Sequence, residues 1–105
     1  MIEISKEDWK LFREIVPIWQ ERYIEQLTKE YINLLSSPGY ASAHFWELEK
    51  RIKKDRKHPG VILEMRKSNA VWDIVDLLRQ DIISWEDLEG FSQELIDVIK
   101  DIESR

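Results

Sequence analysis

The residues best suited to chemistry in this sequence are basic, and they lie in one short segment in the middle of the chain. Residues 50–67 carry eight Lys or Arg and two Asp or Glu, whereas residues 68–105 carry three and ten. Four lysines have the i, i+3, i+4, i+7 spacing that places side chains on one helical face: Lys50, Lys53, Lys54 and Lys57. The sequence therefore predicts a basic stripe in a chain whose net charge is −5.

Three further residues extend this candidate interaction surface. Trp46 lies one helical turn before Lys50, and Arg66 and Lys67 add positive charge from the next expected helix. A basic stripe beside an aromatic ring is typical of surfaces that bind phosphates and stack on single-stranded bases. The stripe also fits an acidic protein partner, or a plain solvated face whose lysine stems cover Trp46. The net acidity of the chain opposes nucleic acid at long range, so a protein partner is favoured.

Patterns for catalysis and metal binding are weak. Cysteine is absent, which excludes thiol nucleophiles, disulfides and Cys-based zinc sites. Only His44 and His58 could act as bases near neutral pH. A di-iron bundle needs two Glu-x-x-His motifs, whereas His44 and Glu47 form a single pair in the reverse order. Asp73 and Asp76 are expected on a solvated face, so we expect no enzyme, no metal and no cofactor.

The first expected helix is long. Ser5 and Asp8 form a variant capping box, with Asp in place of the usual Glu. Apolar residues then recur at helical spacing from Trp9 to Leu34. Pro17 removes a backbone donor and clashes with the preceding turn, so it predicts a kink or a restart there. The helix should end before the Ser-Ser-Pro-Gly break.

Three shorter helices are expected after that break. One should run from about Ala41 to Lys57, with an inward face of Phe45, Leu48 and Ile52. The next should begin near Pro59, because proline suits the first turn of a helix, and end near Gln80. Its apolar arc is wide, so it is either central in the fold or half of a dimer interface. The last should begin at Ser84.

Four amphipathic helices with short connections predict an all-α fold, a compact antiparallel bundle of about four helices in a single domain, residues 1–105. No apolar run approaches the roughly 18 residues that a membrane span needs. The N-terminus also lacks the basic and apolar regions of a signal peptide. With no cysteine, the chain is expected in the cytoplasm and away from membranes.

Several stretches resemble a family of short uncharacterised bacterial proteins, some of which carry the label "multidrug transporter". They are ISKEDWKLFREIVPIWQERYIEQLTKEYINLL, HFWELEKRIKKDRKHPGV and ISWEDLEGFSQEL, which cover nearly the whole chain. The label does not fit a chain without a membrane span. The resemblance implies a bacterial cytoplasmic protein and assigns no functional residue. The expected function is a non-enzymatic protein-interaction or regulatory module, with an acidic protein or a second copy as partner. The alternative is a small nucleic-acid-binding protein that uses the basic stripe.

Overall fold

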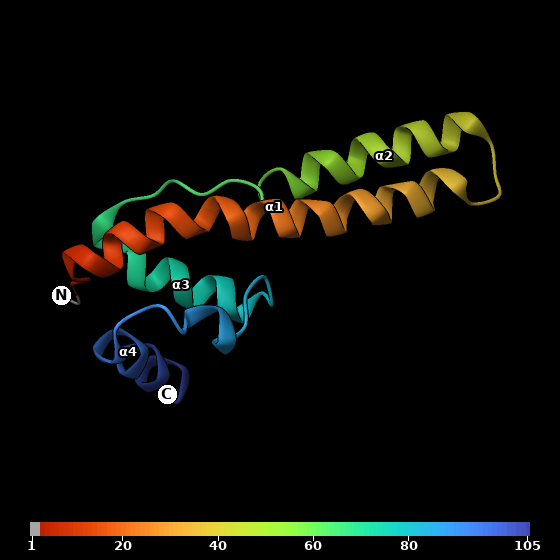
Figure 1. Ribbon diagram of the computed structural model, residues 1–105. Coiled ribbons are helices and arrows are strands. Elements are labelled where there is room, and N and C mark those ends of the chain that lie inside the picture. The colour runs from red at the N-terminus through yellow and green to blue at the C-terminus, as the bar shows by residue number, and fades with distance from the viewer. Residues whose placement is uncertain (1–2) are drawn as a thin grey trace. The chain divides into compact units, whose positions relative to one another are not determined.

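The computed structural model describes residues 3–105, which form α-helices and turns without a strand (Figure 1). This confirms the predicted all-α class and the expected number of main helices. None of the helices described combines the length and apolar character needed to cross a bilayer. The four helices are α1 (Lys6–Ser36), α2 (Ala41–Asp55), α3 (Ala70–Arg79) and α4 (Gln93–Glu103), and 3₁₀ turns cover Lys67–Asn69 and Trp85–Leu88.

The helices belong to two compact units. The core unit combines the chain up to Trp19 with Glu64–Arg105, and the hairpin unit is Gln20–Leu63. Helix α1 therefore supplies its first part to the core unit and its second part to the hairpin unit. Most buried apolar side chains lie in the core unit, whereas Leu27 is the buried apolar residue within the hairpin unit.

The start of α1 is tied to the start of α4 in the core unit. As predicted, the Ser5 hydroxyl accepts the backbone N–H of Asp8 at 3.1 Å. The Asp8 carboxylate is buried and accepts the backbone N–H of Ser92 at 2.9 Å and its hydroxyl at 2.5 Å. The same Ser92 oxygen accepts the N–H of Leu95, at 3.2 Å, and so caps α4. The Asp8 side chain thus links the first turn of α1 to the N-terminal cap of α4.

Helix α1 continues through Pro17 without the break that the sequence predicts as one option. A proline inside a helix costs about 3 kcal/mol because it removes a hydrogen bond and crowds the preceding turn. The neighbouring side chains offset that cost, since Phe12, Val16 and Trp19 are almost completely buried while Pro17 is exposed. Each such burial contributes roughly 1.5–3 kcal/mol.

Helix α3 is shorter than predicted, because it begins at Ala70 and not near Pro59. The segment after Pro59 starts with a tight turn instead. Gly60 donates its N–H to His58 Nδ1 at 3.1 Å, and Val61 donates its N–H to the His58 carbonyl at 2.8 Å. The β-branched residues Val61 and Ile62 favour helix weakly, so they do not restart one.

The wide apolar arc of α3 is central in the core unit. Ala70, Val71, Ile74, Val75 and Leu77 each have at most 2% of their surface exposed. These residues of the predicted arc are therefore buried within the fold, whereas Trp72, which belongs to the same arc, is 51% exposed.

Helix α4 also begins later than predicted, at Gln93 and not at Ser84. The predicted cap at Ser84 is present, since the Asp87 carboxylate accepts the Ser84 N–H at 2.8 Å. It opens only one 3₁₀ turn, which ends before Gly90. The sequence predicts one apolar face for this segment, made by Trp85, Leu88, Phe91, Leu95, Ile99 and Ile102. All of these residues are buried except Trp85, which is 43% exposed.

Candidate interaction surface

The hairpin unit places α2 antiparallel to the second part of α1 (Figure 1). The turn between them includes Gly39, whose φ of 138° is a conformation that side-chain-bearing residues rarely adopt. Three contacts fix the register: Tyr23 with His58 at 4.9 Å between rings, Glu30 with Arg51 at 3.6 Å, and Ser37 with His44 at 3.3 Å. The residue numbers of each of these three pairs add up to 81, as expected for an antiparallel pair of helices joined by a short turn.

The contact between the two helices, here named the seam, is largely polar. Tyr31 donates its hydroxyl hydrogen to Asp55 Oδ2 at 2.5 Å, and the Arg51 guanidinium lies 3.8 Å from the same oxygen. Burial and the hydrogen bond to Asp55 raise the pKa of Tyr31 to about 12. Burial, followed by the charge of Asp55, also raises the pKa of Tyr23. Both phenols are protonated at neutral pH and cannot act as bases there.

Both histidines make contacts within the hairpin unit. His58 stacks on Tyr23 with an interplanar angle of 11°, and its Nδ1 accepts the N–H of Gly60. His44 lies in the first turn of α2 with its Nε2 facing the Ser37 hydroxyl. Among residues 3–105, no group of three or more His, Cys, Asp or Glu side chains could hold a metal ion.

The face that α2 turns toward α1 differs from the predicted one. The residues involved in the seam are spaced alternately by four and three, at His44, Leu48, Arg51, Asp55 and His58. Of the predicted inward residues, Leu48 is half-buried, whereas Phe45 is 62% exposed and Ile52 is 43% exposed. The prediction is therefore wrong for Phe45 and Ile52. No residue of α2 is buried.

Large apolar side chains are exposed on both helices of the hairpin. Phe45 and Ile52 are seven residues apart, so they share one side of α2, about 90° around that helix from the seam. On α1, Leu35 is 48% exposed, and Ile32, which is 56% exposed and nine residues after Tyr23, lies opposite the seam. We name Phe45 and Ile52 the apolar flank.

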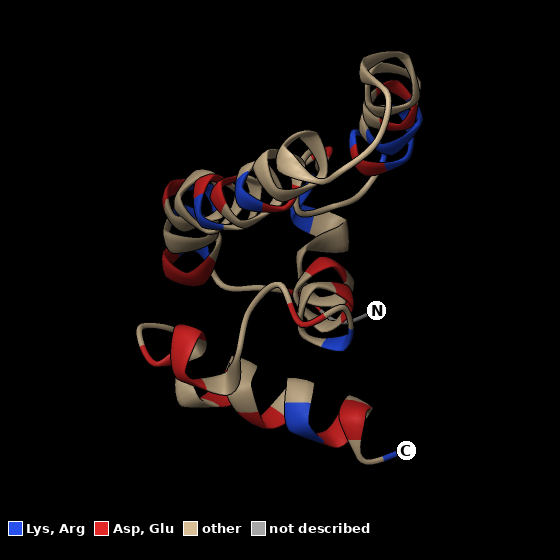
Figure 2. Ribbon diagram, turned by 90° about the vertical axis from the view of Figure 1, so that its right-hand side faces the viewer, with Lys and Arg blue, Asp and Glu red and all other residues tan. Residues whose placement is uncertain are grey.

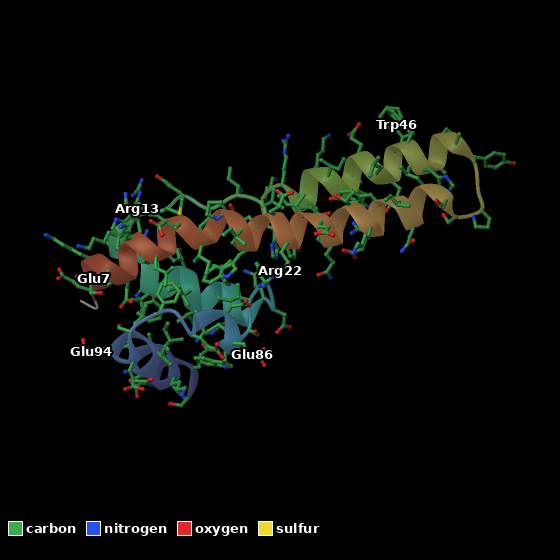
Figure 3. All side chains as sticks on the ribbon, viewed as in Figure 1. Glu7, Arg13, Arg22, Trp46, Glu86 and Glu94 are labelled. Atoms are coloured by element: carbon green, nitrogen blue, oxygen red, sulfur yellow. The ribbon has the colours of Figure 1, made fainter. Side chains whose placement is uncertain are left out.

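The basic stripe lies on α2 away from the seam. Lys50, Lys53, Lys54 and Lys57 are all exposed, and Trp46 is 62% exposed. Blue segments gather along α2 in Figure 2, and Trp46 projects away from α1 in Figure 3. Lys53 also forms an exposed ion pair with Glu49 at 2.9 Å. Helix α2 thus presents an apolar side and a basic side in addition to the seam.

The other two predicted surface residues do not lie on this helix. Arg66 and Lys67 belong to the core unit, where Arg66 has extended backbone and Lys67 begins a 3₁₀ turn. The Arg66 guanidinium pairs with the Glu64 carboxylate at 2.6 Å. The structure places Trp46, Lys50, Lys53 and Lys54 on α2 and Lys57 in the turn after it, and it assigns Arg66 and Lys67 to the other unit.

The core unit contains a pocket of about 570 Å³ at the first turns of α1 and α4. Its lining includes Glu3, Glu7, Asp8 and Glu94, and neither histidine. The Asp8 carboxylate is already bound to Ser92.

Sequence reasoning missed one carboxylate in the core unit. Asp73 was expected on a solvated face, but it is half-buried and its Oδ2 has no hydrogen-bond partner among the described residues. Burial, and secondarily the charge of Asp76, raise its pKa to about 6. Asp76 itself is exposed, as predicted. The sequence signal for this partial burial was the apolar residues on both sides of Asp73, because they leave only a narrow polar arc on the helix.

Compared with protein-family models, curated proteins and solved structures, the chain gives no match. The resemblance to short bacterial proteins therefore stays a prediction. Function has to be argued from the side chains that the helices expose.

Proposed function

We propose that this protein is a non-enzymatic interaction module and that the hairpin unit is its contact surface. The observation that carries the proposal is the apolar flank, Phe45 and Ile52, which are 62% and 43% exposed on one side of α2. A two-helix hairpin cannot enclose an apolar face of its own, and contiguous exposed apolar side chains mark interaction sites.

The polar groups of the hairpin support the same conclusion. Its two histidines, together with Tyr23 and Tyr31, make the contacts that hold the seam and the turns. The basic stripe provides a second contact, suited to an acidic surface on a protein partner. Charged groups around an apolar contact contribute mainly to orientation and association rate.

Chemical crosslinking in a bacterial lysate tests this proposal. Three forms of the full chain are compared: the wild type, Phe45→Glu, and the triple charge reversal of Lys50, Lys53 and Lys57 to Glu. We expect adducts to the wild type, whether to itself or to another protein. The Phe45 variant should lose them, and the triple variant should weaken those that involve an acidic partner. Circular dichroism checks that each variant is folded. An adduct pattern that neither variant changes would rule out the hairpin as the contact surface.

A second candidate function is favoured by the exposed Trp46 beside four exposed lysines. Single-stranded nucleic acid would lie along the basic stripe, with a base stacked on the indole. Binding of a labelled oligonucleotide should then weaken steeply with salt, because phosphate contacts release counterions. Quenching of Trp46 fluorescence should accompany it. Absence of binding at low salt excludes this candidate.

A further inference from the structure

We infer that the end of the hairpin unit nearest its turn binds an anionic lipid surface, with exposed aromatic and aliphatic side chains inserted among the lipids and the lysines of α2 against the headgroups. The inference rests on the proposed function, in which the hairpin unit is the contact surface, and it names a membrane as what this end contacts. The prediction that the chain stays away from membranes came from the lack of a span. Binding to the surface of one leaflet needs no span.

The end of the hairpin carries no formal charge at neutral pH. Residues 31–46 contain no Lys, Arg, Asp or Glu, although these residue types make up 35% of the chain. This segment, here named the uncharged tip, includes the last turns of α1, the connecting turn and the first turns of α2, and it is drawn without red or blue in Figure 2. Its large side chains that are between 48% and 83% exposed are Ile32, Leu35, Tyr40, Phe45 and Trp46. Exposed apolar side chains without charged neighbours are suited to an apolar environment.

The exposed side chains of the uncharged tip point in different directions. Ile32 lies opposite the seam on α1. Trp46 lies opposite the seam on α2, because it is two residues after the seam residue His44 and therefore about 200° around the helix. Phe45 points to a third side, and Tyr40 lies in the turn. A folded protein surface contacts one side of a hairpin, whereas lipids surround a segment that enters them. The arrangement therefore favours a lipid surface as the partner of this tip.

The length of the uncharged tip matches the depth of insertion at a membrane surface. Trp46 is five residues after Ala41, the first residue of α2, which is about 7.5 Å along the helix axis. Apolar side chains bound at a membrane surface reach roughly 5–10 Å into the boundary between headgroups and acyl chains. Insertion to this depth takes up the tip as far as Trp46 and stops before Glu47. Tyr40 and Trp46 are also the residue types that are enriched at this boundary.

Positive charge follows directly behind the uncharged tip. Three lysines lie four to eight residues after Trp46, about 6–12 Å along the axis: Lys50, Lys53 and Lys54. The headgroup layer of one leaflet is roughly 5–8 Å thick, so these ammonium groups reach lipid phosphates when Trp46 is inserted. Residues 47–57 carry six Lys or Arg and three Asp or Glu, a net charge of +3. The acidic residues of the core unit act weakly here, because charges in solvent are screened beyond roughly 8–10 Å. The local charge therefore selects anionic lipids.

The hairpin unit offers a matched pair of isoleucines for the test. Ile32 is 56% exposed and Ile62 is 63% exposed, and both belong to this unit. Ile62 follows the end of α2, so it lies at the end of the hairpin away from the turn. A glutamate at either position adds the same charge to the same unit, but only Ile32→Glu places it among the lipids.

Flotation of the purified full chain with protein-free vesicles measures the binding. One set of vesicles is phosphatidylcholine alone, and the other contains about 30% phosphatidylglycerol, to which binding should be at least about tenfold tighter. Ile32→Glu and Trp46→Glu should each weaken binding by at least about tenfold, and Ile62→Glu by less than about threefold. Alanine at Lys50, Lys53 and Lys54 together should weaken binding to the anionic vesicles on the order of 100-fold, because each lysine contributes about fivefold. Circular dichroism checks that the variants are helical.

Fluorescence quenching by lipids with brominated acyl chains tests insertion directly. The other tryptophans of the chain belong to the core unit. Quenching should therefore disappear in Trp46→Phe, which keeps an aromatic ring and should still bind the vesicles.

Three results would overturn the inference. They are no binding to anionic vesicles at low salt, equal losses for Ile32→Glu and Ile62→Glu, and binding without quenching of Trp46. Because the vesicles hold no protein, a chain that ignores them but still forms Phe45-dependent adducts in the lysate overturns the inference and leaves the proposed function standing.

Discussion

The half-buried carboxylate of Asp73 predicts an unusual dependence of stability on pH. Its pKa is raised to about 6, mainly by burial and secondarily by Asp76, so the folded state holds this proton more tightly than the unfolded chain. Stability therefore falls as pH rises from about 4 to about 6, because in that range the unfolded state has already lost the proton. Above that range the folded state carries the full cost of a partly buried charge.

Asp73→Asn removes that charge with little change in shape. A shift of about two pKa units corresponds to roughly 3 kcal/mol in the absence of screening. Partial exposure of the side chain reduces this to about 1–2 kcal/mol. Asp73 also lies in the first turn of α3, where a negative charge gains about 0.3–1 kcal/mol from the helix dipole. The variant should therefore be more stable than the wild type by about 1 kcal/mol at pH 7.5.

Thermal melts of both proteins between pH 4 and 7.5 provide the assay. At pH 7.5 the variant should melt roughly 4–8 °C higher, and the difference should vanish near pH 4. Asp76→Asn is the matched control, because it removes an exposed charge from the same helix and should change stability by less than about 0.5 kcal/mol. A variant that is no more stable at pH 7.5, or a gain that is the same at pH 4, would refute the reasoning.

Two further predictions concern close packing and a buried link. Gly60→Ala should destabilise the hairpin unit by about 1–3 kcal/mol in chemical denaturation, because the new Cβ would lie 2.4 Å from the Tyr23 ring. Gly90→Ala is its control, since the added atom would meet only a flexible side chain at 3.2 Å, and an equal loss for both would show that the close contact does not matter. Asp8→Ala should cost about 1–3 kcal/mol, because the backbone N–H and the hydroxyl of Ser92 lose the buried carboxylate that accepts from them. An unchanged unfolding midpoint for that variant would mean that water replaces the carboxylate.

The parts of the fold that local signals control could be predicted from the sequence. Ser5 caps α1, and the lysines of α2 are exposed, as their spacing on one helical face indicated. The start of α3 could not be predicted, because proline at position 59 is compatible with a turn as well as with the first turn of a helix. The hydrogen bond from the Gly60 N–H to His58 stabilises the turn. At Ser84 the capping chemistry was correct, but capping groups cannot specify how many turns follow them.

The candidate surface was predicted only in part, for a reason that lies in the seam. Phe45 and Ile52 were expected to face inward because apolar residues usually do. The side facing α1 is instead held by ionic and hydrogen-bonded partners, among them Arg51 and Asp55. From the sequence alone, a charged residue that pairs with a neighbouring helix cannot be distinguished from one that faces solvent. Its partner is known only when the position of the second helix is known.

The absence of any buried residue on α2 has a consequence for local opening. Amide hydrogens exchange with solvent when a segment opens, and segments with little buried apolar surface open at low free energy. Amides of α2 should therefore exchange in deuterated buffer well before those of α3, whose apolar residues are enclosed. The hairpin unit can thus open as a separate cooperative element while the core unit stays folded.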